Sequence, residues 1–258
     1  MKKNIQYKNY FINKFQAKNL RFKFDKIFKK IKNNLNYEKD TYHFLSKNFK
    51  INFNTKELSK FKKFNTIVII GMGGSILGSC AIYNFLKDKV KKNLIFFDDL
   101  DSKKLLDFKK GNNLNKCLFI VISKSGNTME TLANFTSLNI IKKNTKNIIV
   151  ISERKNNILF SLSKKYNLFF IEHKKYLGGR YSVLSEVGLV PAFLMGLNIK
   201  RLRKNLFSHI LKNKKFLRES SAVLANFLNK KNFKNIIFLN YSPKLESFLL
   251  WLHQLIAE

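Results

Sequence analysis

The sequence predicts an α/β fold: a three-layer α/β/α sandwich around a parallel, five-stranded sheet. Short continuous apolar runs, typical of strands buried on both faces, alternate with segments long enough for helices. Loops rich in Gly and Ser follow the first and third runs, as at the carboxyl ends of parallel strands. Such alternation predicts crossover connections that place helices on both faces of the sheet. The expected strands are Ile67–Ile70, Leu94–Phe97, Leu118–Ile122, Ile148–Ile151 and Leu168–Ile171.

The segments on either side of this domain, which we assign to residues 61–200, have a different character. Residues 1–60 are rich in Lys and Asn with recurring Phe, Ile and Leu, and predict a helical amino-terminal segment. Residues 201–258 predict connecting helices, a new strand over Ile236–Leu239 and a strongly helical Leu245–Glu258. Because a lone strand and helix cannot bury their own faces, we expect these residues to begin a second, incomplete α/β domain.

The formal net charge of +34 would ordinarily suggest a nucleic-acid partner. The lysines, however, are spread from Lys2 to Lys244, and Arg, the favoured reader of bases, occurs only six times. This distribution favours compositional drift over a specific nucleic-acid interface. No apolar run is long enough to span a membrane, and the amino terminus lacks the apolar core of a secretory signal. Cys80 and Cys117 lie in expected core elements, so we expect reduced thiols and a cytoplasmic protein.

The loop after the third strand carries the strongest chemical signal. Ser123-Lys-Ser-Gly-Asn-Thr128 joins the buried run to an amphipathic helix expected over Met129–Lys142. Three hydroxyls, a Gly and a Lys at a helix amino terminus can together bind one phosphate group. The alternative is a turn in which Ser and Thr only cap the helix.

The loop after the first strand, Gly71-Met-Gly-Gly-Ser-Ile-Leu-Gly78, is also rich in Gly. It differs from a dinucleotide-binding fingerprint because Ile76 stands where the third Gly belongs. Gly74 and Ser75 could instead contact a sugar or its phosphate, or the loop could be a purely structural turn. Parallel sheets bring such loops together at one edge, where both could bind a small phosphorylated ligand.

Two further segments add charge to this picture. Residues 177–182, Leu-Gly-Gly-Arg-Tyr-Ser, place Arg180 after a turn, where it could bind anionic oxygens or lie on the surface beside a helix cap. The last helix carries a polar stripe that includes Gln254 and Glu258. This stripe could be a solvated face, but on so apolar a helix its carboxylate could also be a general base. The four histidines show no metal-ligand spacing.

Four motifs, taken in order, resemble those of the glucose-6-phosphate isomerase family, which is built from sugar-isomerase (SIS) domains. They are Gly-Met-Gly-Gly-Ser75, Ser123-Lys-Ser-Gly-Asn-Thr-Met-Glu-Thr131, Gly-Gly-Arg180-Tyr-Ser and Trp251-Leu-His-Gln-Leu-Ile-Ala-Glu258. The sequence departs from the family pattern at Lys175 and Glu186. The resemblance implies two SIS domains, glycolytic and gluconeogenic aldose–ketose isomerisation in the cytoplasm, a homodimer, and no metal or nucleotide cofactor.

The resemblance also implies roles for single residues. Arg180 would stabilise an enediolate, Gln254 would orient the substrate and Glu258 would carry the proton between C1 and C2. The remaining substrate-binding positions would be Gly74 and Ser75 for the sugar, and Ser123, Lys124 (through its backbone), Ser125 and Thr128 for the phosphate. Two further functions stay open: an isomerase that also accepts mannose 6-phosphate, and a SIS module that binds sugar phosphates without chemistry. The family's ring-opening His and carboxy-terminal Lys would follow Glu258, so we expect this chain to be a weakly active part of a longer enzyme.

Overall fold

A computed structural model describes residues 14–230 and 235–257 of the chain. The described residues form two compact units, one made of residues 14–49 with 205–230 and 235–239, and the other of residues 50–204 with 240–257. The predicted domain limits, with a second SIS domain beginning within 201–258, stay a prediction. No helix among the described residues is long and apolar enough to cross a membrane.

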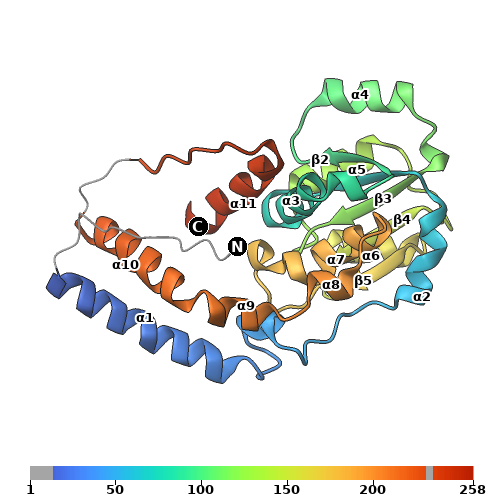
Figure 1. Ribbon diagram of the computed structural model, residues 1–258. Coiled ribbons are helices and arrows are strands. Elements are labelled where there is room, and N and C mark those ends of the chain that lie inside the picture. The colour runs from blue at the N-terminus through green and yellow to red at the C-terminus, as the bar shows by residue number, and fades with distance from the viewer. Residues whose placement is uncertain (1–13, 231–234, 258) are drawn as a thin grey trace. The chain divides into compact units, whose positions relative to one another are not determined.

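The larger unit contains the predicted parallel sheet, and the α/β fold class is confirmed (Figure 1). Its strands are paired in the order β2-β1-β3-β4-β5, and every pair is parallel. β3 is buried along its whole length, as its continuous apolar run predicts. The strands are β1 (Thr66–Ile70), β2 (Asn93–Phe97), β3 (Cys117–Ile122), β4 (Ile148–Ser152) and β5 (Phe169–Glu172).

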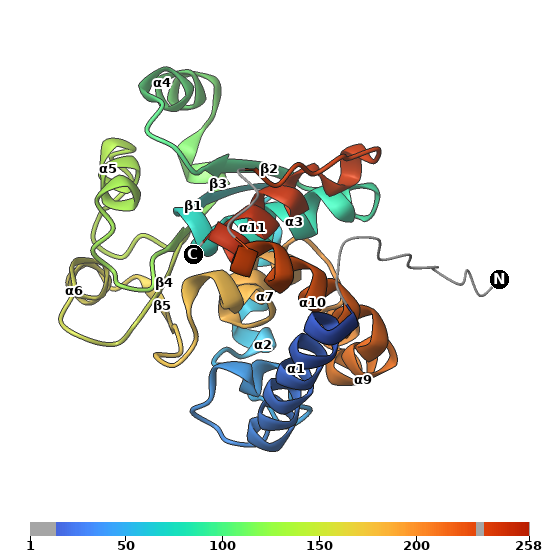
Figure 2. The same cartoon turned by 90° about the vertical axis from the view of Figure 1, so that its left-hand side faces the viewer.

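Helices cover both faces of this sheet (Figure 2). Alternate strand residues point to opposite faces, so Ile67 and Ile69 belong to one core, and Val68 and Ile70 to the other. The first core is closed by α2 (Thr55–Leu58), α3 (Leu77–Phe85), α7 (Glu186–Leu194) and α8 (Ile199–Leu202). The second is closed by α4 (Ser102–Gly111), α5 (Met129–Ser137) and α6 (Ile158–Lys165). Cys80 and Cys117 are buried free thiols, one in each core.

The strand order creates a switch point between β1 and β3. These two strands are direct neighbours, with Ile70 opposite Val121, while the chain leaves β1 toward β2 and leaves β3 toward β4. Ligands of open α/β sheets bind in the crevice outside the carboxyl ends of the strands at such a point. The loops after β1 and β3, which contain Ser75 and Ser123–Thr128, both begin there.

The smaller unit is helical, as expected for the amino-terminal segment. It contains α1 (Lys14–Asn34), α9 (Leu206–Lys212) and α10 (Lys214–Lys230). Arg21 on α1 donates to the Glu219 carboxylate on α10, from Nη2 at 2.5 Å and from Nε at 2.9 and 3.0 Å. Asp25, one turn further along α1, binds Lys214 at 2.9 Å and Arg218 at 3.2 Å. The charged residues of these helices therefore fix an antiparallel pairing of α1 with α10.

Two predicted elements differ from the structure. The helix expected over Met129–Lys142 ends at Ser137, because Asn139 adopts a left-handed backbone conformation with φ of 54°. The prediction of a strand over Ile236–Leu239 was wrong, since these residues have no regular secondary structure. Ile237 and Leu239 are 80% and 75% exposed. A strand needs a neighbour for its backbone hydrogen bonds, and no strand of the described chain pairs with this segment.

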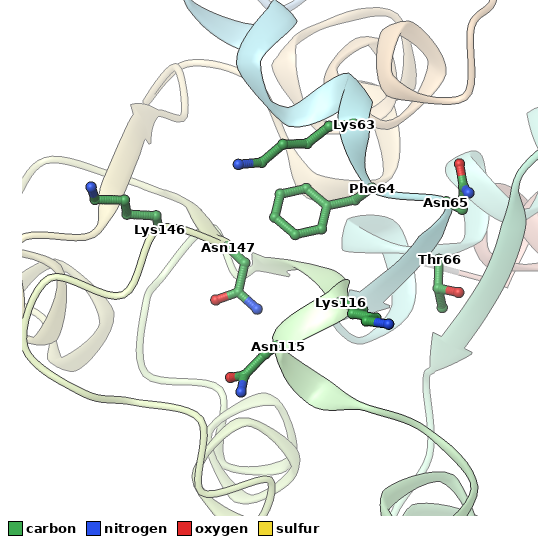
Figure 3. A pocket seen from close by; sticks show the side chains of 8 residues that line it. All are labelled: Lys63, Phe64, Asn65, Thr66, Asn115, Lys116, Lys146 and Asn147. Atoms are coloured by element: carbon green, nitrogen blue, oxygen red, sulfur yellow. The ribbon is translucent and has the colours of Figure 1, made fainter.

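A cavity of about 680 Å³ lies where β1, β3 and β4 begin, at the end of the sheet opposite the loops after β1 and β3 (Figure 3). It contains three lysines and three asparagines around the Phe64 ring, and no carboxylate is among its lining residues. It lies at the amino ends of the same strands whose carboxyl ends carry the predicted loops. The lining residues are Lys63, Phe64, Asn65, Thr66, Asn115, Lys116, Lys146 and Asn147.

Candidate functional site

A cavity of about 420 Å³ lies at the carboxyl edge of the sheet, at the switch point between β1 and β3. Four stretches that are far apart in the sequence line it: the turn after β1, the loop after β3, the loop before α7, and α11 (Glu246–Ala257). Seven of the predicted site residues are among its lining residues. The full lining is Met72, Gly74, Ser75, Lys124, Ser125, Thr128, Gly178, Gly179, Arg180, Tyr181 and Gln254.

The loop after β3 gathers three hydroxyl groups into a small cluster. The Ser123 and Thr128 oxygens are 2.8 Å apart, and Ser125 Oγ lies 3.3 Å from Ser123 and 3.4 Å from Thr128. Thr128 precedes α5 as its N-cap residue, yet its side chain makes no capping hydrogen bond. The turn is thus not a simple side-chain cap, and the Thr128 hydroxyl is directed to the cluster. The positive end of the α5 dipole and three hydroxyls are a suitable site for an anion.

The segment after β4 supports this loop from behind. Glu153 N–H donates to Lys124 O at 3.1 Å, and Leu159 N–H donates to Gly126 O at 3.1 Å. The Glu153 carboxylate, which is 6% exposed, also lies 3.7 Å from the Lys124 ammonium. Asn157 Oδ1 accepts from Phe160 N–H at 2.9 Å, so it caps α6. The loop that carries the hydroxyls is therefore held by backbone hydrogen bonds and one ion pair.

Arg180 reaches the cavity because two loops pass unusually close to each other. A Cβ added at Gly74 would lie 2.4 Å from Arg180 N and 2.4 Å from Gly179 C. Only a residue without a side chain allows this approach. The Arg180 guanidinium lies 5.3 Å from the centre of the Tyr181 ring, within the range of a cation–π contact.

The last helix, α11, completes the cavity wall with Gln254. A Cβ added at Gly73 would lie 2.8 Å from Gln254 Nε2, so this side chain contacts the turn after β1. Three residues before Gln254, the indole N–H of Trp251 donates to Arg180 O at 2.9 Å. α11 is thus tied both to the Gly-rich turn and to the loop that carries Arg180.

The predicted site residues fall into three groups. Gly74, Ser75, Lys124, Ser125, Thr128, Arg180 and Gln254 line the cavity together. Ser123 is only 1% exposed and lies beneath it, where its hydroxyl accepts from Gly126 N–H at 3.1 Å. Glu258, predicted as the catalytic carboxylate, lies outside the described residues.

Sequence reasoning missed the residues that support the site rather than line it. Glu153 and Asn157 follow β4, next to β3, and their position at the carboxyl end of a neighbouring strand was the available signal. Trp251 begins the motif Trp251–Glu258, but its hydrogen bond to Arg180 depends on how α11 packs and has no sequence signature. Among the described residues, no group of three or more His, Cys, Asp or Glu side chains could hold a metal ion.

Two buried titratable groups lie near the base of the Arg180 loop. Glu186 is 1% exposed at the start of α7, and burial raises the pKa of its carboxyl above the ordinary value of 4.5. Lys174 at 3.6 Å and a 2.6 Å hydrogen bond from Asn52 N–H oppose this rise. His173, after β5, is 2% exposed, and burial lowers the pKa of its imidazole to about 4. The imidazole is therefore neutral at pH 7.

Replacing Glu186 with Gln should change how stability depends on pH. A carboxyl whose pKa is raised by folding stabilises the fold below its unfolded pKa, and this contribution disappears as pH rises through the folded pKa. Burial of His173 has the opposite effect on stability. Between about pH 6.5 and 4 the imidazole is protonated in the unfolded chain but not in the folded one, so its contribution to stability falls as pH falls. Glu186→Gln removes the loss of stability that the Glu186 carboxyl causes as pH rises. The free energy of unfolding of the variant minus that of the unaltered chain should therefore increase as pH rises above 4.5.

Urea unfolding at a series of pH values measures this difference. Asp107→Asn, at an exposed position on α4, is the matched control for the removal of one carboxylate from the same unit. A difference between Glu186→Gln and the unaltered chain that stays constant from pH 4.5 to about pH 8 would contradict the prediction.

The sequence matches the family described as phosphoglucose isomerase over residues 20–255. It is 32% identical to the glucose-6-phosphate isomerase of Methanocaldococcus jannaschii over 213 residues, which cover 79% of this chain and 53% of the relative. It is 31% identical to the glucose-6-phosphate isomerase of Acholeplasma laidlawii over 217 residues, covering 76% of this chain and 50% of the relative. The chain therefore spans about half the length of these curated relatives.

Solved structures show a similar fold. A hypothetical protein of Thermus thermophilus matches 93% of this chain and 60% of its own with a TM-score of 0.72 and 20% identity. A glucose-6-phosphate isomerase from Chlamydia trachomatis matches 78% of this chain and 41% of its own with a TM-score of 0.61 and 24% identity. At these identities the likeness concerns the fold alone.

Proposed function

Because the chain belongs to the phosphoglucose isomerase family, we propose that it is part of an enzyme that interconverts glucose 6-phosphate and fructose 6-phosphate. The observation that carries this proposal is the convergence of a hydroxyl cluster, a guanidinium and an amide on one cavity of about 420 Å³. The chain spans about half the length of these relatives, and we infer that the whole enzyme works as a homodimer with a second SIS domain.

The loop after β3 would hold the phosphate. Ser125 and Thr128 supply hydroxyls, Lys124 supplies its backbone N–H, and Ser123 orients the other two hydroxyls from below. The α5 dipole adds a favourable potential for the dianion. Gly74 and Ser75, across the switch point, would contact the sugar.

The chemical step needs a carboxylate that moves a proton between adjacent carbons and a cation near their oxygens. A base removes the proton from C2 of the open-chain aldose, and the electron pair forms an enediolate with its negative charge on O1. The base then returns a proton, which can exchange with solvent, to C1, while the O2 hydroxyl proton passes to O1. In this proposal Glu258 is the base and Arg180 stabilises the negative oxygen of the enediolate. Gln254, four residues before Glu258 in the sequence, orients the substrate between them.

The experiment separates binding from proton transfer. The chain is titrated with glucose 6-phosphate, mannose 6-phosphate and unphosphorylated glucose by calorimetry, and deuterium exchange into C1 of fructose 6-phosphate is followed by NMR in D₂O. We expect the phosphate esters but not glucose to bind, and a slow exchange that depends on the chain. Glu258→Gln should lower the exchange rate by about 10² to 10⁴-fold and leave the affinity almost unchanged.

Each outcome has a distinct meaning. No binding of either ester at millimolar concentration would contradict the proposed function. Binding with an exchange rate that Glu258→Gln does not change would mean that another group is the base. Deuterium exchange at C2 of mannose 6-phosphate as fast as that into fructose 6-phosphate would broaden the substrate range to both sugars. Binding with no exchange would indicate a module that binds sugar phosphates without chemistry.

A further inference from the structure

α11 is fastened along the side of the cavity through contacts with α3 and with the turn after β1. The Asn84 amide on α3 donates to the Ser247 hydroxyl, and Lys244, just before α11, pairs with Asp88. Gln254 packs onto Gly73 at the other end of the helix. The orientation of α11 about its own axis is therefore fixed, and with it the direction in which its side chains point.

Trp251, the only tryptophan of the chain, uses this orientation to bind the loop that carries Arg180. Its indole N–H donates to the Arg180 carbonyl oxygen at 2.9 Å, and the Phe248 ring packs edge-on against the indole, 5.8 Å between centres. An indole N–H is a donor only and needs an acceptor when it is removed from water. Here the acceptor is the main chain of the residue whose guanidinium lines the cavity.

The loop around Arg180 is thus held from two sides. On one side Gly74 allows the Gly179–Arg180 peptide to rest directly on the turn after β1. On the other side the indole N–H holds the carbonyl of the same residue. Because the main-chain atoms on both sides of the Arg180 Cα are held, the position at which its side chain begins is fixed. Fewer side-chain conformations then have to be restricted when a ligand binds.

We propose that Trp251 is a positioning residue, which fixes the main chain of Arg180 so that its guanidinium faces the sugar rather than the phosphate end of the ligand. This inference rests on the proposed function and adds a residue to it. It predicts that the indole N–H contributes to the binding of a sugar phosphate and not to the binding of phosphate alone. Even a small displacement of the Arg180 guanidinium should weaken sugar phosphate binding, because its hydrogen bonds to the ligand depend on distance and angle.

The test compares two ligands in Trp251→Phe, which keeps an aromatic ring but removes the indole N–H together with the five-membered part of the ring system. Calorimetry should show glucose 6-phosphate bound about 3- to 10-fold more weakly, the equivalent of one hydrogen bond. Inorganic phosphate, which needs only the loop after β3, should bind with unchanged affinity. Tyr241→Phe, which removes an aromatic donor at a position 91% exposed, is the matched control and should leave both affinities unchanged.

A double-mutant cycle tests whether Trp251 acts through Arg180. If it does, Trp251→Phe should have no further effect on glucose 6-phosphate binding once Arg180→Ala has removed the guanidinium. Losses that simply add up, or an equal loss of inorganic phosphate binding, would overturn the inference, as would an unchanged affinity in Trp251→Phe.

One measurement is independent of any ligand. The single indole N–H gives a single NMR signal, and the hydrogen bond to Arg180 predicts slow exchange of this proton with water. Rapid exchange would overturn the inference and leave the proposed function untouched. Slow exchange in a chain that binds no sugar phosphate would show the contact to be structural only, and would contradict the proposed function together with the positioning role.

Discussion

Gly74→Ala is expected to disrupt the cavity and to abolish most of the sugar phosphate binding. The added methyl would lie 2.4 Å from Arg180 N and Gly179 C, and both are backbone atoms that no side-chain rotation can move away. The turn after β1 or the loop that carries Arg180 must therefore shift. Overpacking of this kind costs about 1–3 kcal/mol of unfolding free energy. Because both displaced segments line the cavity, glucose 6-phosphate affinity should fall by more than about 10-fold.

Urea unfolding and calorimetric titration measure the two effects in the same preparation. Gly111→Ala is the matched control, since a Cβ at Gly111 meets nothing within 4 Å. It should leave ligand affinity unchanged and raise stability by about 0.4–1 kcal/mol through the unfolded state. A Gly74→Ala variant that binds glucose 6-phosphate as the unaltered chain does would contradict the close packing of the two loops.

The fold was predictable where the signal lies within one segment. Each of the five apolar runs forms a strand within one or two residues of its expected limits, because a continuous run such as Leu118–Ile122 can be buried only between two helical layers. Ile236–Leu239 has the same composition and forms no strand. Strand formation depends on a neighbour for hydrogen bonding, and that information is not contained in the segment itself.

The same distinction explains what could be predicted of the site. The loops after β1 and β3 were identifiable because their residue types and their place after strands are local features. That they share one cavity with Arg180 and Gln254 follows from packing, above all from the missing side chain at Gly74. Likewise, nothing in the sequence near Ser123 shows that this serine supports the hydroxyl cluster from below rather than lining the cavity.

The second large effect is expected at Gly126, in the middle of the loop after β3. Its φ is 72°, a conformation that disfavours any residue with a Cβ. A Cβ there would also lie 1.9 Å from Asn157 Oδ1, the atom that caps α6. Gly126→Ala should therefore lose the cap in addition to the backbone strain, together roughly 2–4 kcal/mol of unfolding free energy. Inorganic phosphate binding should be lost with the loop geometry.

A double-mutant cycle separates the two causes. In Asn157→Ala the obstructing amide is absent, so adding Gly126→Ala should cost less: the backbone strain of about 1 kcal/mol and a rotation of the Ser152 hydroxyl, which would lie 2.7 Å from the new Cβ. The effects of the two substitutions on unfolding free energy should then sum to more than the effect of the double variant. Strict additivity would contradict the contact between Gly126 and Asn157, since independent sites do not share a penalty. The contact matters because it is how the segment after β4 fixes the loop after β3: the cap of α6 and the proposed anion site at the start of α5 depend on the same few atoms.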